Sequence, residues 1–243
     1  MIKFKTINQA QQFAKKKINK GTYNWLMAGA ENNYTEQKNI KDLENIKIEP
    51  KILNKTDKIN LKCKFLNTLL PSPLILSPMG HQTQFNKFGE IETSKGTNKY
   101  GTLSFFSTQG RFDLEEIKKK SKNKKIVWEI FPFGDKSWIE KQIKNAEKLN
   151  CLAVSFCFDA NVRSQRYMDI ETGYDARKYG IRKMEPPPDP SLSRQYDWDF
   201  IKWLKKKTKL KIIPKGLINL QDIKKIDKIL GDFIWISNHG GRM

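Results

Sequence analysis

The stretch FIWISNHGGR, residues 233–242, indicates the architecture of this protein. Its first four residues are apolar, and the apolar run stops at Ser237. A histidine and an arginine, His239 and Arg242, follow with two glycines between them. A buried strand that ends in a base and a cation is typical of an α/β barrel, in which the chemistry lies at the carboxyl ends of the strands.

The same unit recurs along the preceding sequence: a short apolar run, a polar or glycine break, then a helical pattern. The apolar runs lie at 74–76, 103–106, 126–131, 152–158, 211–214 and 233–236. The helical patterns lie at 90–100, 114–121, 138–149, 198–207 and 220–230. Such alternation predicts right-handed βαβ units and a parallel sheet. With about six strands where a closed barrel has eight, the prediction is an α/β fold, an incomplete (β/α)8 TIM-type barrel.

Two parts of the chain differ from this repeat. Residues 1–70 are expected to form a helical N-terminal extension followed by a short hairpin at the bottom of the barrel, and 71–243 to form the partial barrel. A long connection, about 160–197, contains the sequence EPPPDP at 185–190. A loop of this length is typically a lid, a binding loop or a disordered segment, and its prolines argue against a regular helix.

The charge of the chain raises the question of nucleic-acid binding. The formal net charge is +20, with 46 Lys and Arg against 26 Asp and Glu, but only seven of the basic residues are Arg. The lysines are spread over almost every helical pattern, whereas nucleic-acid binders cluster Arg and aromatic residues on one face. We therefore interpret the lysines as solvated faces, expect no nucleic-acid partner, and keep a basic nucleic-acid-binding protein as the least favoured alternative.

Cysteine usage and hydropathy indicate the compartment. The three cysteines, Cys63, Cys151 and Cys157, lack the spacing of a metal site, so a reduced chain without a metal ion is expected. The N-terminus has no signal-like apolar core, and no apolar run approaches the roughly 20 residues that span a bilayer. The sequence thus predicts a cytoplasmic protein, and its basic surface leaves peripheral contact with a membrane open.

Polar residues gather where the predicted strands end. Taken singly, each has a structural interpretation: a strand-end His is often structural, and an Asp can cap the next helix. Together they point to a carboxylate-bearing substrate held by Arg and to a His base stabilised by an Asp. In chain order the strand ends are Ser77-Pro78-Met79-Gly80; Ser107-Thr108-Gln109; Glu129 with Phe131; Cys157 and Asp159 with Arg163 and Arg166; Lys215-Gly216; and Ser237 to Arg242.

These residues resemble those of a known family. The run SNHGGR at 237–242 is similar to the signature of the FMN-dependent 2-hydroxy acid oxidases and dehydrogenases, the glycolate oxidase and L-lactate dehydrogenase group. Supporting stretches, in the same order as in the family, are AGAE at 28–31, PKIL at 50–53, SPMG at 77–80, GE at 89–90, ST at 107–108, Asp159 with Arg166 and Asp169, and KG at 215–216.

The resemblance implies an activity and the partners that go with it. It implies FMN-dependent oxidation of a lactate-like L-2-hydroxy acid to the 2-oxo acid. His239 is expected to accept a proton from the substrate, Asp159 to stabilise the protonated His, and Arg166 with Arg242 to bind the substrate carboxylate. The electron acceptor is expected to be oxygen, a quinone or a cytochrome, and the assembly a homo-oligomer, a tetramer by resemblance.

The resemblance also implies which residues contact the flavin. Lys215 matches the lysine near flavin N1 and O2, where a fixed cation stabilises the anionic reduced ring. The other positions that match the family's flavin contacts are Pro78, Met79, Gly80, Ser107, Glu129, Cys157 and Ser237.

Four positions depart from the family pattern. Trp25 and Phe131 stand where substrate-contacting tyrosines are usual, which removes two hydroxyl hydrogen bonds of about 0.5–1.5 kcal/mol each. The neighbouring Tyr23 would supply the first hydroxyl only if the local register differs. Glu129 replaces a glutamine and Cys157 a threonine. A more apolar substrate or weaker catalysis would fit these changes. They motivate the alternative of a flavin-binding but non-catalytic relative.

The family continues with two more βα units, which carry the grip on the FMN phosphate. The sequence in hand stops before them at Met243. We therefore expect it to be the N-terminal portion of a longer protein.

Overall fold

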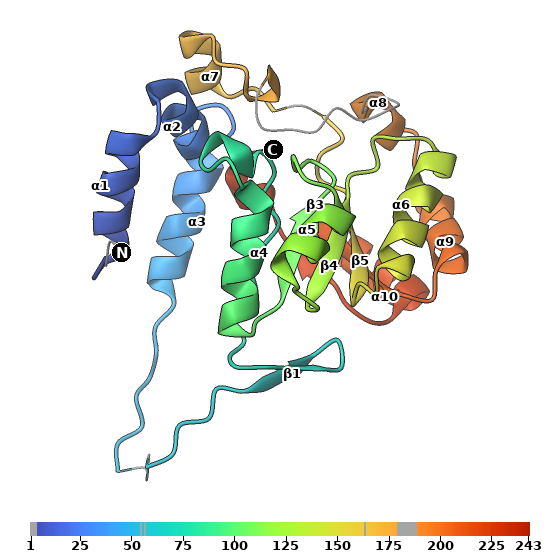
Figure 1. Cartoon of the computed structure of the whole chain (residues 1–243), viewed down its shortest axis with the longest axis horizontal. Coiled ribbons are helices and arrows are strands. Elements are labelled where there is room, and N and C mark those ends of the chain that lie inside the picture. Colours follow the sequence, from blue (N-terminus) through green and yellow to red (C-terminus); the bar gives the residue numbers. More distant parts are fainter. Residues whose placement is uncertain (1–3, 54, 56, 163, 179–188) are drawn as a thin grey trace.

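The computed structural model describes residues 4–53, 55, 57–162, 164–178 and 189–243. Five parallel strands form one sheet in the order β3 (Ser104–Ser107), β4 (Ile126–Ile130), β5 (Ala153–Cys157), β6 (Lys211–Leu217) and β7 (Trp235–Ile236). The sheet curls into part of a barrel with helices on its outer side (Figure 1). The predicted incomplete α/β barrel is confirmed.

The outer helices lie where the sequence predicts them. They are α4 (Gly89–Tyr100), α5 (Leu114–Ser121), α6 (Lys136–Lys148), α9 (Trp198–Lys207) and α10 (Leu220–Leu230). Four of them begin directly after a side chain that accepts hydrogen bonds from backbone N–H groups of the first turn: Asp113, Asp135, Asp197 and Asn219. Such caps satisfy donors that have no partner inside the helix, and they set where each helix starts.

The strands separate two layers of core. Phe106, Trp128 and Phe156 belong to the cluster between the sheet and helices α5, α6 and α9. Their neighbours along the strands, such as Phe105 and Val127, belong to a second cluster inside the curl. This follows from the alternation of side chains along a strand. The interior is therefore packed, and the polar strand ends are the part left for chemistry.

An antiparallel hairpin closes the inner cluster from below. It pairs β1 (Cys63–Phe65) with β2 (Thr68–Leu70), as predicted for this region. Leu70 is fully buried in the inner cluster. The hairpin therefore covers the end of the barrel opposite to the polar strand ends.

The N-terminal helices pack against the end of the chain. They are α1 (Ile7–Lys17), α2 (Lys20–Met27) and α3 (Tyr34–Asn45), blue in Figure 1. The Ala30 N–H donates to the Gly241 carbonyl at 2.8 Å. A Cβ on Gly241 would lie 2.5 Å from the Glu36 nitrogen, so only glycine permits this approach. The boundary predicted at residue 70 stays a prediction.

The prediction of a first strand at 74–76 is wrong. Only a parallel bridge between Leu76 and Ser104 forms there, so the sheet has five strands instead of six. Pro73 and Pro78 flank the segment, and proline cannot donate to a sheet ladder. Leu74 is 70% exposed, so little apolar burial stabilises the pairing.

The connection 160–197 contains more helix than predicted. It holds α7 (Tyr167–Thr172), the 3-10 turn Ala176–Lys178 and the short helix α8 (Pro190–Ser193). The expectation that its prolines exclude a regular helix is wrong at Pro190, which lies in the first turn of α8, where a missing N–H costs nothing. Residues 179–188, with most of the proline run, and Arg163 lie outside the described residues.

Within the described part of the chain, no helix combines the length and apolarity needed to cross a bilayer. The predicted cytoplasmic location, and peripheral contact with a membrane, stay predictions.

Candidate active site

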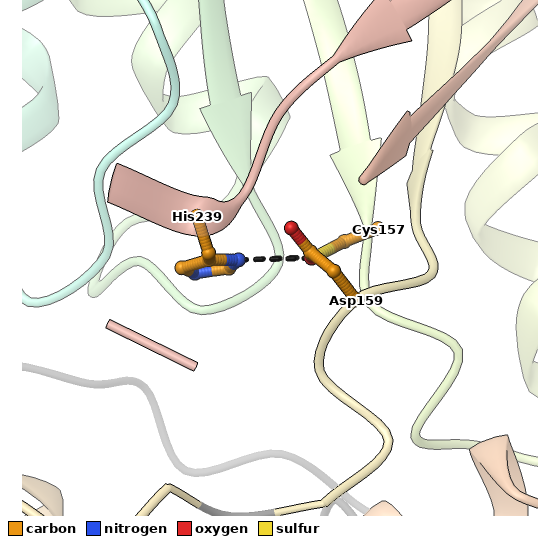
Figure 2. A group of neighbouring side chains, drawn as sticks. All are labelled: Cys157, Asp159 and His239. Carbon is orange, nitrogen blue, oxygen red and sulfur yellow. Dashed lines mark hydrogen bonds and ion pairs between the residues drawn. The ribbon is translucent and has the colours of Figure 1, made fainter. Parts of the chain in front are cut away.

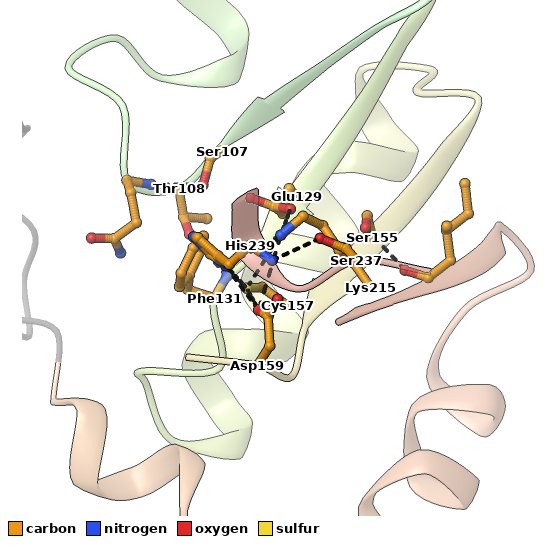
Figure 3. A network of polar contacts seen from close by, with 12 residues as sticks. Ser107, Thr108, Glu129, Phe131, Ser155, Cys157, Asp159, Lys215, Ser237 and His239 are labelled. Atoms are coloured by element: carbon orange, nitrogen blue, oxygen red, sulfur yellow. Dashed lines mark hydrogen bonds and ion pairs between the residues drawn. The ribbon is translucent and has the colours of Figure 1, made fainter. Parts of the chain in front are cut away.

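Adjacent parallel strands bring the predicted site residues together. The ladder pairs Ser107 of β3 with Glu129 of β4, and Cys157 of β5 with Lys215 of β6. Parallel strands end at the same edge of the sheet, so these side chains form one cluster, to which the turn after β7 adds His239 (Figure 3).

The centre of the cluster is a hydrogen bond between His239 and Asp159. The Nδ1 atom of His239 lies 2.9 Å from Oδ1 of Asp159 (Figure 2). The backbone of His239 has a φ of 57°, which is uncommon for a non-glycine residue, and its N–H donates to Ser237 Oγ at 3.1 Å. The turn is thus arranged to present the ring, and bonding at Nδ1 leaves Nε2 for a ligand.

Asp159 remains an anion in this setting. Burial favours a higher pKa for Asp159, but the hydrogen bonds from His239 and Cys157 outweigh it and the pKa lies below its usual value. The Cys157 thiol donates to the same Oδ1 atom at 2.8 Å. Burial raises the pKa of Cys157 well above its usual value, so the thiol keeps its proton as this donor. Asp159 can therefore stabilise a protonated imidazole.

Lys215 supplies a buried positive charge. The residue is 6% exposed. Its Nζ atom lies 3.4 Å from His239 Nδ1, 3.9 Å from Asp159 Oδ1 and 4.0 Å from Glu129 Oε2. One ammonium thus faces two carboxyl groups, and this fixed cation suits a ligand that becomes negatively charged.

Glu129 is the second carboxyl group at this ammonium. It is 2% exposed, and burial raises its pKa to about 7, although Lys215 opposes the shift. Its Oε2 atom has no hydrogen-bond partner among the described residues. A buried polar atom without a partner is costly, so this oxygen marks a place where a ligand can bind.

Cys157, Asp159 and His239 also have the atom types of a metal site. Their potential ligand atoms lie within 4.8 Å of one another. The Lys215 ammonium, however, lies 3.4 Å from the His239 nitrogen and 3.8 Å from the Cys157 sulfur. This cation and the protonated thiol disfavour a metal ion at the same place.

The side chain of Arg166 contacts the backbone of Arg242 and not its guanidinium group. Arg166 Nη2 donates to the Arg242 carbonyl at 3.4 Å. The Arg242 guanidinium donates to the Gly240 carbonyl at 2.8 Å and to the Leu26 carbonyl, at the end of α2, at 3.0 Å. The carboxylate-binding role expected for both side chains stays a prediction, in which a carboxylate replaces these carbonyl contacts.

The two aromatic departures lie in different places. The Phe131 ring centroid lies 6.1 Å from that of His239 in an edge-to-face arrangement. The ring centroid of Trp25 lies 5.9 Å from the guanidinium carbon of Arg166. It lies 5.3 Å from the ring centroid of His81. Phe131 thus borders the base, and Trp25 borders one of the arginines.

The segment Pro78-Met79-Gly80 runs beside the end of β3. A Cβ on Gly80 would lie 3.1 Å from the Gln109 carbonyl oxygen, so a side chain there would crowd that loop. Ser107 is 2% exposed and its Oγ accepts from the Gln109 N–H at 3.2 Å. Gly80 and Ser107, two residues predicted to contact the flavin, thus both lie against Gln109.

Some residues of this region were not predicted. Ser155 is fully buried in the wall beside Glu129 and donates to the Ile213 carbonyl at 2.9 Å; its position two residues before Cys157 was the available signal. The Tyr174 hydroxyl lies 2.8 Å from Thr22 Oγ1 and ties the long connection to α2. No sequence pattern indicates that pairing.

Curated proteins similar to this chain include 2-hydroxy acid oxidases. A 2-hydroxyacid oxidase from Dictyostelium discoideum is 22% identical over 252 residues, covering 98% of this chain and 65% of the relative. A peroxisomal (S)-2-hydroxyacid oxidase from Arabidopsis thaliana is 26% identical over 250 residues, covering 97% of this chain and 69% of the relative. The chain thus spans about two thirds of the length of these relatives.

Solved structures share the fold. A mandelate oxidase variant with 2-hydroxy-phenylacetamide superposes with a TM-score of 0.89 at 18% identity, covering 99% of this chain and 70% of that chain. A chimera of (S)-mandelate dehydrogenase gives 0.87 at 19% identity, covering 97% and 71%. The model of the FMN-dependent dehydrogenase family matches residues 14–243, so the chain belongs to that family.

Proposed function

We propose that this site oxidises a lactate-like L-2-hydroxy acid to the 2-oxo acid with FMN, and that His239 accepts the substrate proton. The observation that carries the proposal is the 2.9 Å bond between His239 Nδ1 and the ionised Asp159, beside the buried Lys215 ammonium. For such a reaction the protein supplies a base, an anion that stabilises the protonated base, and a fixed cation.

The residues present fit FMN. The Oε2 atom of Glu129, which has no hydrogen-bond partner in the described part of the chain, and the buried Lys215 ammonium would offer polar contacts to a bound flavin ring. When bound, FMN would supply the acceptor for the α-hydrogen and the two electrons that leave with it. The residues proposed to hold it are Pro78, Met79, Gly80, Ser107, Glu129, Cys157, Lys215 and Ser237.

Each side chain has a stated part in the proposed reaction. His239 takes the hydroxyl proton at Nε2 while its Nδ1 stays bonded to Asp159, whose charge stabilises the imidazolium. Lys215 compensates negative charge that develops beside it. Arg166 and Arg242 bind the substrate carboxylate, for which Arg242 exchanges its contacts with backbone carbonyls.

The proposed substrate class follows from the site wall. Phe131 lies beside His239 without a hydroxyl group, so the wall favours a substrate with an apolar side chain.

The proposed electron acceptor is oxygen, a quinone or a cytochrome. The proposed assembly is a homo-oligomer, a tetramer.

Anaerobic reduction tests the proposal. FMN bound to the protein is expected to bleach on addition of L-lactate, glycolate or (S)-mandelate, and His239→Ala is expected to abolish bleaching while FMN still binds. A protein that binds FMN but is not bleached by any 2-hydroxy acid would be the non-catalytic relative that Trp25, Phe131 and Glu129 suggest. A protein that binds no FMN contradicts both.

A further inference from the structure

Glu129 and Asp159 each have one buried carboxyl oxygen without a hydrogen-bond partner among the described residues, Oε2 and Oδ2 respectively. The Glu129 side chain is the more deeply buried of the two. The residue is 2% exposed in β4, between Ser107 of β3 and Ser155 of β5. The Ser107 side chain hydrogen-bonds the carboxyl group. Oε2 has no hydrogen-bond partner among the described residues, and the Lys215 ammonium, at 4.0 Å, is beyond hydrogen-bonding distance.

The charged and titratable groups around Glu129 come from each neighbouring element. Neighbouring β5 carries Cys157 and leads to Asp159, β6 carries Lys215, and the turn after β7 carries His239, whereas β3 offers only the Ser107 hydroxyl. Asp159 and Glu129 thus compete for one ammonium, at 3.9 and 4.0 Å.

Asp159 is the better stabilised of the two anions. Its Oδ1 atom accepts from His239 at 2.9 Å and from the Cys157 thiol at 2.8 Å. Glu129 has the Ser107 hydroxyl and a more complete burial. When two buried carboxyl groups share one cation, the group with fewer donors keeps the proton.

We propose that Glu129 meets the flavin as a carboxylic acid, whose Oε2 proton is donated to an acceptor atom of the bound ring, so that above neutrality cofactor binding takes up one proton from solvent. The inference rests on the proposed function. A carbonyl or imine edge is the ligand chemistry that an acid recognises, because an ionised carboxylate offers only acceptors. The neutral acid also leaves the Lys215 charge to compensate Asp159 and the electron-rich ring.

The test is titration of FMN into the full chain by quenching of flavin fluorescence between pH 5.5 and 8.5. Glu129→Gln keeps the size and a donor but cannot ionise. Expressing the wild-type Kd relative to that of E129Q at each pH cancels the ionisation of the FMN phosphate, near pH 6. This ratio is expected to be constant at low pH and to rise about tenfold per pH unit above neutrality, the slope for one proton.

Glu90→Gln is the matched control. Glu90 is also fully buried, on α4, and its Oε1 accepts the Arg111 N–H at 3.3 Å. E90Q removes a buried carboxyl group of the same size and is expected to keep the wild-type pH dependence of FMN binding. The same loss of pH dependence in E90Q as in E129Q would contradict a specific role for Glu129.

The infrared difference between wild type and E129Q separates the two possible failures. A protonated carboxyl band at pH 6 that disappears by pH 8.5 is expected. No such band, or a wild-type to E129Q ratio of Kd independent of pH, overturns this inference and leaves the proposed function standing. No FMN binding at any pH by wild type and E129Q overturns the proposed function and the inference with it.

Discussion

Gly216 and Asp159 are in such close contact that no other residue fits at position 216. A Cβ on Gly216 would lie 2.6 Å from both Cβ and Cγ of Asp159. Gly216 has a φ of 98° at the register shift between Lys215 and Leu217, where β6 pairs with β7. The irregular strand thus brings Asp159 against β6, where His239 and Lys215 reach it.

We predict that Gly216→Ala displaces Asp159 and disrupts its bond to His239. The positive φ alone costs about 1–2 kcal/mol for a residue with a Cβ, and the overlap with Asp159 adds to it. Thermal unfolding and the ring 15N shifts of His239 measure the two effects. Gly101→Ala is the control, since Gly101 has a φ of 85° and a Cβ added to it would meet no other atom within 4 Å. Equal effects of both substitutions would exclude displacement of Asp159.

Asp159→Asn is predicted to slow the chemical step. The amide keeps the size of the side chain but loses the charge that stabilises the imidazolium of His239. The rate of anaerobic flavin reduction is expected to fall about 10²- to 10⁴-fold, the range for a general base. Asp222→Asn, on the exposed surface of α10, is the control and should reduce the flavin at the wild-type rate. Wild-type rates in D159N would remove Asp159 from the mechanism.

Stability is predicted to fall as pH rises from about 4.5 to 7, because of Glu129. Its pKa is raised from 4.5 to about 7, mainly by burial. The folded state therefore holds a proton that the unfolded state has lost in this window, and the free energy of unfolding decreases as pH rises through it. The contribution is about 3 kcal/mol. Urea unfolding of wild type and Glu129→Gln measures it, and parallel pH profiles would contradict it.

Arg242→Ala is predicted to loosen the contact between the N-terminal helices and the strand ends. The guanidinium donates to the Leu26 and Gly240 carbonyls, and its loss is expected to cost about 1–2 kcal/mol. KM for the 2-hydroxy acid is expected to rise as well, if Arg242 binds the carboxylate. Arg194→Ala, at an exposed position after α8, is the control. Unchanged unfolding in R242A would show that these hydrogen bonds do not stabilise the fold.

Phe131→Tyr is predicted to raise kcat/KM for small polar substrates. A hydroxyl group on this ring lies near His239 and can add one hydrogen bond to the substrate, worth about 0.5–1.5 kcal/mol, which is about 2- to 13-fold in kcat/KM for glycolate. Phe133→Tyr, on the ring 5.2 Å away, is the control. An equal gain from both changes would indicate a general effect of polarity instead of a contact with substrate.

The sequence predicted those elements that local rules control. Helices α5, α9 and α10 were predicted to the residue, because a capping side chain and an amphipathic pattern fall within one segment. The segment 74–76 was predicted as a strand and forms one bridge, because only Ile75 packs against the inner core, whereas Leu74 and Leu76 stay exposed. Pairing at an edge depends on neighbours that a local pattern does not contain.

The sequence by itself determined the parallel αβ order, the family signature and the set of polar residues at the strand ends, since each depends on residues close together in the chain. Only the tertiary structure decided how these residues interact. It brought the Cys157 thiol and the His239 ring to the same oxygen of Asp159. Along the chain His239 lies 80 positions from Asp159 and 82 from Cys157. It also placed Arg242 on the carbonyl of Leu26, 216 positions away. The strand irregularity at Gly216 brings Asp159 against β6, and packing of the N-terminal helices on the turn after β7 brings Leu26 to Arg242. Both depend on packing between distant parts of the chain.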